Sequence, residues 1–98
     1  MRNSKSNSGQ HTAVFNIIGV LVSVYEGKNK NYANIRVDGE EINPKTKKPY
    51  YSMYKIRFDK SVELPDDGAP VAIAGTVTTY FDKETSTLIT YLNGITIS

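Results

Sequence analysis

The sequence has 98 residues, of which 39% are hydrophobic and 22% are charged, as is typical of a single folded domain. The net charge of +2 is small, so a nucleic-acid site would depend on where the cations lie and not on total charge. Cysteine is absent and His11 is the only histidine, which excludes disulfides and thiolate metal sites. We therefore expect no metal, no cofactor and no enzymatic activity.

Residues 1–12 are polar after Met1 and contain no apolar signal-peptide segment. Such a stretch buries too little apolar surface to stay ordered, so we expect a flexible tail before a single domain at residues 13–98. No apolar run approaches the roughly 20 residues that are needed to cross a bilayer. The sequence therefore predicts a protein without a membrane partner, and the absence of cysteine makes the cytoplasm the expected location.

Five segments favour β-strands, because they are rich in Val, Ile, Thr and Tyr and largely alternate between apolar and polar residues. The first, residues 13–26, is apolar on both faces and contains Gly19. The other strands are predicted at residues 32–38, 51–59, 71–81 and 88–97. A turn is expected at residues 27–31, a long loop at 39–50, a connection without a helix at 60–70 and a hairpin loop at 82–87.

Five strands without a helix, in a chain of this length, indicate an all-β fold, a five-stranded OB-type Greek-key barrel. Glycines inside the first, fourth and fifth strands are typical of a small barrel that bends sharply, and Asn93-Gly94 is expected to form a bulge. An SH3-like barrel and a small sandwich remain alternatives. The predicted core is Phe15, Ile17, Leu21, Ile35, Val37, Ile56, Phe58, Ile73, Val77 and Ile95.

In FNIIGVL, residues 15–21, apolar residues alternate up to a glycine and a leucine. This stretch resembles the first strand of the single-stranded-DNA-binding proteins of bacteria and phages. Residues 64–97 are similar to the end of those domains, with a glycine turn, an apolar strand with a central glycine, a charged hairpin and a last strand. The sequence ends at Ser98 and has no tryptophan, so the resemblance is to compact phage or mobile-element members without an acidic C-terminal tail.

The resemblance implies a protein that binds single-stranded DNA with little sequence specificity and coats it during replication or recombination. If Ile35 and Ile56 point into the barrel, the opposite face of these two strands combines rings for base stacking with cations for phosphates. OB domains place ligands on this surface. The predicted binding residues there are Tyr32, Asn34, Arg36, Tyr51, Met53, Lys55 and Arg57. The alternative is an ordinary solvated sheet surface.

The loops supply a second set of candidates. Lys45, Lys47, Lys48 and Tyr50 are expected to fold over a bound strand, whereas Glu40 and Glu41 reduce the local positive charge. Around the last hairpin the candidates are Tyr80 and Lys83, and Lys28 and Lys30 lie in the first turn. Tyr80 and Tyr91 would either stack on bases or pair across strands, and we favour pairing for Tyr91. Three acidic residues are interpreted as turn formers: Asp59, Asp66 and Asp67.

Two alternative functions stay open. The sequence does not separate DNA from RNA, because the distinction depends on individual 2′-hydroxyl contacts. A tyrosine-rich surface also suits a structural or adaptor protein that binds another protein. Because the first strand is apolar on both faces, a homodimer or homotetramer is expected. Its interface would include some of Val14, Ile18, Val20, Val22 and Val24.

Overall fold

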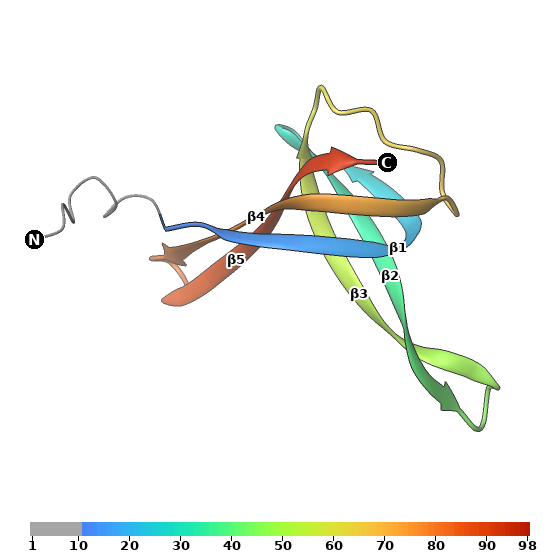
Figure 1. The fold of residues 1–98 in the computed structure, drawn as a ribbon. Coiled ribbons are helices and arrows are strands. Elements are labelled where there is room, and N and C mark those ends of the chain that lie inside the picture. Colours follow the sequence, from blue (N-terminus) through green and yellow to red (C-terminus); the bar gives the residue numbers. More distant parts are fainter. Residues whose placement is uncertain (1–10) are drawn as a thin grey trace, which may run out of the picture.

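The structure is a computed structural model that describes residues 11–98. Five strands close into one barrel in the order β1-β2-β3-β5-β4 (Figure 1). The strands are β1 (Ala13–Glu26), β2 (Lys30–Asn43), β3 (Lys48–Asp59), β4 (Pro70–Asp82) and β5 (Thr87–Ile97). Neighbouring strands are antiparallel except β3 and β5, which are parallel. The expected all-β OB-type barrel is thus confirmed.

The boundaries of β1 match the prediction, and β4 and β5 differ from it by one residue at their ends. The connection between β3 and β4 contains no helix. None of the residues from 11 to 98 forms a helix long and apolar enough to span a membrane. The tail predicted at residues 1–12 lies outside the described residues apart from His11 and Thr12, which are exposed.

The core lies inside the barrel and is built mainly from alternate residues of the strands. Seven hydrophobic residues are buried: Leu21, Ala33, Ile35, Ile56, Phe58, Val71 and Ile73. Phe15, Ile17 and Val37 from the predicted core are partly buried and pack against this cluster. Val77 is half-buried. The placement of Ile35 and Ile56 at 0% exposure fixes their strand neighbours on the outer face.

The prediction that Ile95 lies in the core is wrong, since its side chain is 62% exposed. Gly75 pairs with Gly94, but Ala74 pairs with Thr96, so Ile95 is the additional residue of a β-bulge. The bulge shifts the alternation of β5 by one residue, and Ile97 packs against the core in place of Ile95. The bulge expected at Asn93-Gly94 is therefore present, immediately after Gly94.

Gly94 of β5 is required because the Phe58 ring lies too close to leave room for a side chain. An added Cβ at Gly94 would overlap the ring of the buried Phe58. At Gly75 an added Cβ would overlap the backbone carbonyl of Asn93. These contacts explain why the barrel strands carry glycines at the positions where they cross closely.

The long loop predicted at residues 39–50 is also wrong. β2 and β3 continue as a paired hairpin to Asn43 and Lys48, so only residues 44–47 form the turn. This extension projects from the barrel (Figure 1), and we call residues 38–51 the arm. Three residues of β2 oppose the single Tyr50 of β3, because the register shifts between Asp38 and Ile42. The bulge accommodates the irregular sequence that reads as a loop, and Pro49 is the partner of Ile42 just beyond it. The arm has only two strands, and proline is tolerated in such edge strands.

Candidate nucleic-acid interface

The outer faces of β2 and β3 form one continuous surface. Tyr32 lies opposite Arg57, Asn34 opposite Lys55, and Arg36 opposite Met53. Residues opposite each other in antiparallel strands have Cβ atoms about 4.5–5.5 Å apart, so each of these pairs is in contact range. Tyr51, at the base of the arm, continues the surface and is 62% exposed. We call the seven residues the outer face: Tyr32, Asn34, Arg36, Tyr51, Met53, Lys55 and Arg57.

Arg57 joins the outer face to β5. Its guanidinium carbon lies 3.8 Å from the centre of the Tyr91 ring, a cation–π contact. Its Nε also donates a hydrogen bond to Oδ1 of Asn93. Arg57 and Asn93 are partners in the short parallel pairing of β3 with β5. The guanidinium is therefore held in a fixed position on the barrel surface.

Asn93 is itself held in one orientation. Its Nδ2 donates to Oγ1 of Thr78 at 3.0 Å and to the Thr76 carbonyl at 3.3 Å. Because the amide nitrogen donates both of its hydrogen bonds to β4, the amide oxygen faces Arg57. The side chain thus connects three strands and positions a cation, although the sequence alone gave no reason to select it.

Tyr80 and Tyr91 form a stacked pair with ring centres 5.4 Å apart and an angle of 15° between the rings. Their hydroxyl groups share a hydrogen bond of 3.0 Å. This hydrogen bond, followed by desolvation, raises the pKa of Tyr80 above its ordinary value. The pairing expected for Tyr91 is confirmed. One face of the half-exposed Tyr80 ring is covered by this partner, so a base would stack on its other face.

A second aromatic contact lies at the β1 end of the surface. Tyr25 and Tyr32 are cross-strand partners, and their ring centres are 5.9 Å apart. Together with Arg57 and the two tyrosines on β4 and β5, they form a series of neighbouring groups with one member on each strand. We call this series the stacking row: Tyr25, Tyr32, Arg57, Tyr91 and Tyr80. Sequence reasoning missed Tyr25, because the bulge between Leu21 and Ser23 decides that it points outward.

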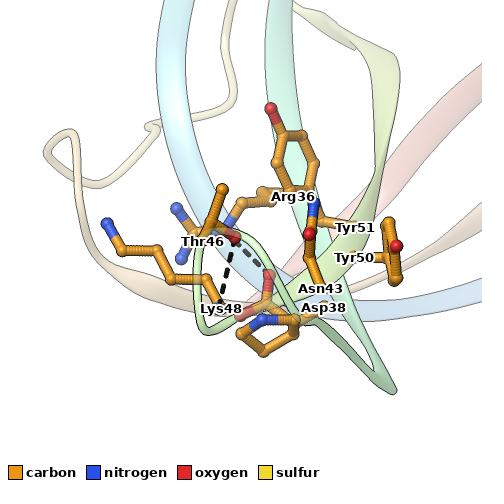
Figure 2. A pocket seen from close by; sticks show the side chains of 8 residues that line it. Arg36, Asp38, Asn43, Thr46, Lys48, Tyr50 and Tyr51 are labelled. Atoms are coloured by element: carbon orange, nitrogen blue, oxygen red, sulfur yellow. Dashed lines mark hydrogen bonds and ion pairs between the residues drawn. The ribbon is translucent and has the colours of Figure 1, made fainter.

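A hollow of about 810 Å³ lies where the arm leaves the barrel (Figure 2). Its lining residues come from β2, β3 and the turn between them: Arg36, Asp38, Asn43, Thr46, Lys48, Pro49, Tyr50 and Tyr51. Nε of Arg36 donates to Oδ1 of Asp38 at 3.1 Å. In Figure 2 the Arg36 and Lys48 side chains extend toward the same side of the hollow. The hollow continues the outer face, with which it shares Arg36 and Tyr51.

The predicted loop cations are not all brought to one place. Lys45 and Lys47 lie in the exposed turn at the tip of the arm, where the Asn43 side chain and carbonyl accept hydrogen bonds from their backbone amides. Lys83 lies in the turn of the β4–β5 hairpin, which projects from a different part of the barrel (Figure 1). Lys48, the fourth predicted lysine, is the only one of the four that lines the hollow. Lys45, Lys47 and Lys83 therefore lie on hairpin turns outside the outer face.

Asp59 takes the local role expected of a turn former, and the Asp66 carbonyl accepts a hydrogen bond from the Ala69 amide across the turn that contains Asp67. Oδ1 of Asp59 accepts hydrogen bonds from the backbone amide of Ser61 at 2.9 Å and from its hydroxyl at 2.7 Å. These bonds, the backbone one first, hold the pKa of Asp59 below its ordinary value. Within residues 11–98, no three His, Asp or Glu side chains are grouped in a way that could hold a metal ion.

No protein-family model matches the chain, and no curated protein matches it.

Proposed function

We propose that this protein binds single-stranded DNA along the outer face without acting on it chemically. The observation that carries the proposal is the register of β2 and β3, which aligns aromatic and cationic side chains on one outward surface. Tyr51, Met53 and Lys55 are exposed there, and the other members of the outer face are half-buried. Sequence-tolerant binding of single strands needs both kinds of group, rings that stack on bases and cations that attract phosphates. The resemblance of residues 15–21 and 64–97 to single-stranded-DNA-binding proteins supports the same function.

The stacking row adds a geometric argument. Because Arg57 is held against Tyr91 and Asn93, it loses little conformational freedom when a ligand contacts it. Tyr32, which lies opposite Arg57, provides a ring beside that cation. A strand that crosses the barrel there would stack a base on Tyr32 and place a phosphate near Arg57. Lys45 and Lys47 at the tip of the arm and Lys83 in the β4–β5 turn would add longer-range attraction for the phosphates of the strand.

We further propose that two or more copies associate through the outer surface of β1 and β4. Val14 and Ile18 of β1 are 75% and 77% exposed, and both point away from the core. Burial of such side chains in an interface stabilises it by roughly 25 cal/mol for each Å² removed from water. In this proposal the protein acts as a homodimer or homotetramer in the cytoplasm of a bacterial host, during replication or recombination.

The test is a fluorescence-anisotropy titration of the protein with oligo-dT, with oligo-rU and with a duplex of equal length. We expect the tightest binding to oligo-dT, because a duplex hides the faces of its bases. Tighter binding of oligo-rU would favour the RNA alternative. If none of the three is bound, the proposal is wrong and the protein-binding alternative becomes the better explanation of the exposed tyrosines.

A further inference from the structure

We infer that the hollow at the base of the arm is a guanine-selective subsite in which Asp38 reads the base. The inference rests on the proposed binding of single-stranded DNA. The Asp38 carboxylate lies in the hollow beside Arg36 and Lys48. A negative charge there would repel a bound phosphate. The presence of the carboxylate there is explained if its ligand is a group of hydrogen-bond donors and not an anion.

The Asp38 carboxylate is placed to accept hydrogen bonds from a ligand. It is exposed, and Nε of Arg36 donates to its Oδ1 at 3.1 Å. An ionised carboxylate accepts about four hydrogen bonds in all. In the part of the chain that the structure describes, this is the only side-chain hydrogen bond of Asp38, so Oδ2 has acceptor capacity left. The ion pair with Arg36 also reduces the repulsion between the carboxylate and a nearby phosphate.

Tyr51 provides the surface on which a base would stack. It is the cross-strand partner of Asp38, and both side chains line the hollow. A base lying on the Tyr51 ring would therefore direct one edge toward the carboxylate. Lys48 and Arg36 also line the hollow and would contact the flanking phosphates. The volume of about 810 Å³ is in the range of small-molecule sites and accommodates one nucleotide.

The donor pattern of the bases selects guanine. Its Watson–Crick edge carries the N1–H and N2–H donors side by side, which match the two oxygens of a carboxylate. Adenine and cytosine place a ring acceptor beside the amino group, and thymine places carbonyls on both sides of N3–H. Each of these acceptors would face the carboxylate oxygens and repel them. Two-point recognition of one base contributes a discrimination of roughly fivefold or more.

The experiment measures the affinity of the protein for oligo-dT carrying one central replacement by dG, deoxyinosine, dA or dC. We expect the dG oligonucleotide to bind at least about fivefold more tightly than all-dT. Deoxyinosine, which lacks the N2 amino group, should give a smaller gain. The D38N variant should bind the dG oligonucleotide and oligo-dT almost equally, because its amide nitrogen no longer accepts a hydrogen bond. D67N, which changes the charge equally in the β3–β4 connection, is the control and should keep the preference.

The outcomes separate this inference from the function on which it rests. Binding of oligo-dT with equal affinity for all four replacements would overturn guanine selection and leave single-strand binding in place. A dG preference that persists in D38N would also overturn it, because another group would then read the base. Failure to bind any of these oligonucleotides would reject the proposed function, and the subsite with it.

Discussion

The guanidinium carbon of Arg57 lies 3.8 Å above the ring of Tyr91, whose neighbour on the other side is Tyr80. Because β5 lies between β3 and β4, the cation and the second ring approach Tyr91 from opposite sides. Tyr91 is thus a support for its neighbours, and the free faces of the stack belong to Arg57 and Tyr80.

Two replacements of Arg57 distinguish the contribution of its charge to binding from that of its planar shape. R57A should weaken oligo-dT binding and flatten the slope of log K against log salt by about 0.7, the value for one lost contact with a single strand. R57K should keep the slope but still weaken binding several-fold, because an ammonium group lacks the planar shape that stacks on Tyr91. Titrations at a series of salt concentrations measure both effects. K60A, which removes an exposed cation after β3, is the control, and an equal response of R57A and K60A would contradict the prediction.

Truncation of the outward tyrosines should reduce affinity without unfolding the barrel. Y32A and Y51A should each weaken oligo-dT binding by about 1–3 kcal/mol, the usual contribution of a base stacked on an aromatic ring. Anisotropy titration gives the affinity, and circular dichroism tests the fold. Y54A is the matched control and should keep the affinity, because Tyr54 is the cross-strand partner of the buried Ile35 and so lies on the opposite face of β3. Wild-type affinity in both folded variants would show that the outer face is only a solvated surface.

The contact between Gly94 and Phe58 predicts a loss of stability. In G94A the new methyl group would overlap the Phe58 ring, which is 1% exposed and has little room to move. Overpacking of this kind destabilises a core by about 1–3 kcal/mol. Urea unfolding followed by circular dichroism measures the change. G39A is the control, because its Cβ would meet only one carbonyl, that of Tyr50 at 3.3 Å. A larger loss in G39A than in G94A would contradict the packing described here.

The hydrogen bond between Tyr80 and Tyr91 predicts a measurable titration. The pKa of Tyr80 is raised above its ordinary value of 10.0, first by this bond and then by desolvation. A raised folded pKa favours the neutral hydroxyl, so its stabilising effect is complete below about pH 10 and is lost as the pH rises through the folded value. Y91F should lower the pKa of Tyr80. Absorbance titration at alkaline pH, with Y80F subtracted to isolate the residue, tests this. An unchanged Tyr80 titration in Y91F would show that the bond is not formed in solution.

The proposed association of copies predicts a change of mass. Light scattering of the wild-type protein at micromolar concentration should give a multiple of the chain mass. I18E, which places a charge on the exposed surface of β1, should give the monomer, because an unpaired charge is costly to bury. L88E is the control and should keep the mass of the wild-type protein. Leu88 is similarly exposed, at 72%, but it lies in the β4–β5 hairpin, outside the proposed interface. A monomeric wild-type protein would contradict the proposal.

The sequence by itself determined the strand content and most of the core. Alternation is a local property of a strand, so the pattern around Ile35 and Ile56 was sufficient to place Tyr32, Arg36 and Arg57 on the outer face. Glycines within the strands predicted the sharp bends of a small barrel. At position 94 the structure adds the local reason, since only a residue without a Cβ fits beside Phe58.

Only the tertiary structure decided the features that depend on pairing between strands. Ile95 points outward because the register of β5 against β4 shifts there, and the arm is a hairpin because β2 and β3 continue to pair beyond the bulge. The contact of Arg57 with Tyr91 requires the parallel pairing of β3 with β5, which no local pattern encodes. Register between distant strands is fixed by the packing of the whole barrel, so it cannot be obtained from the alternation of any one segment.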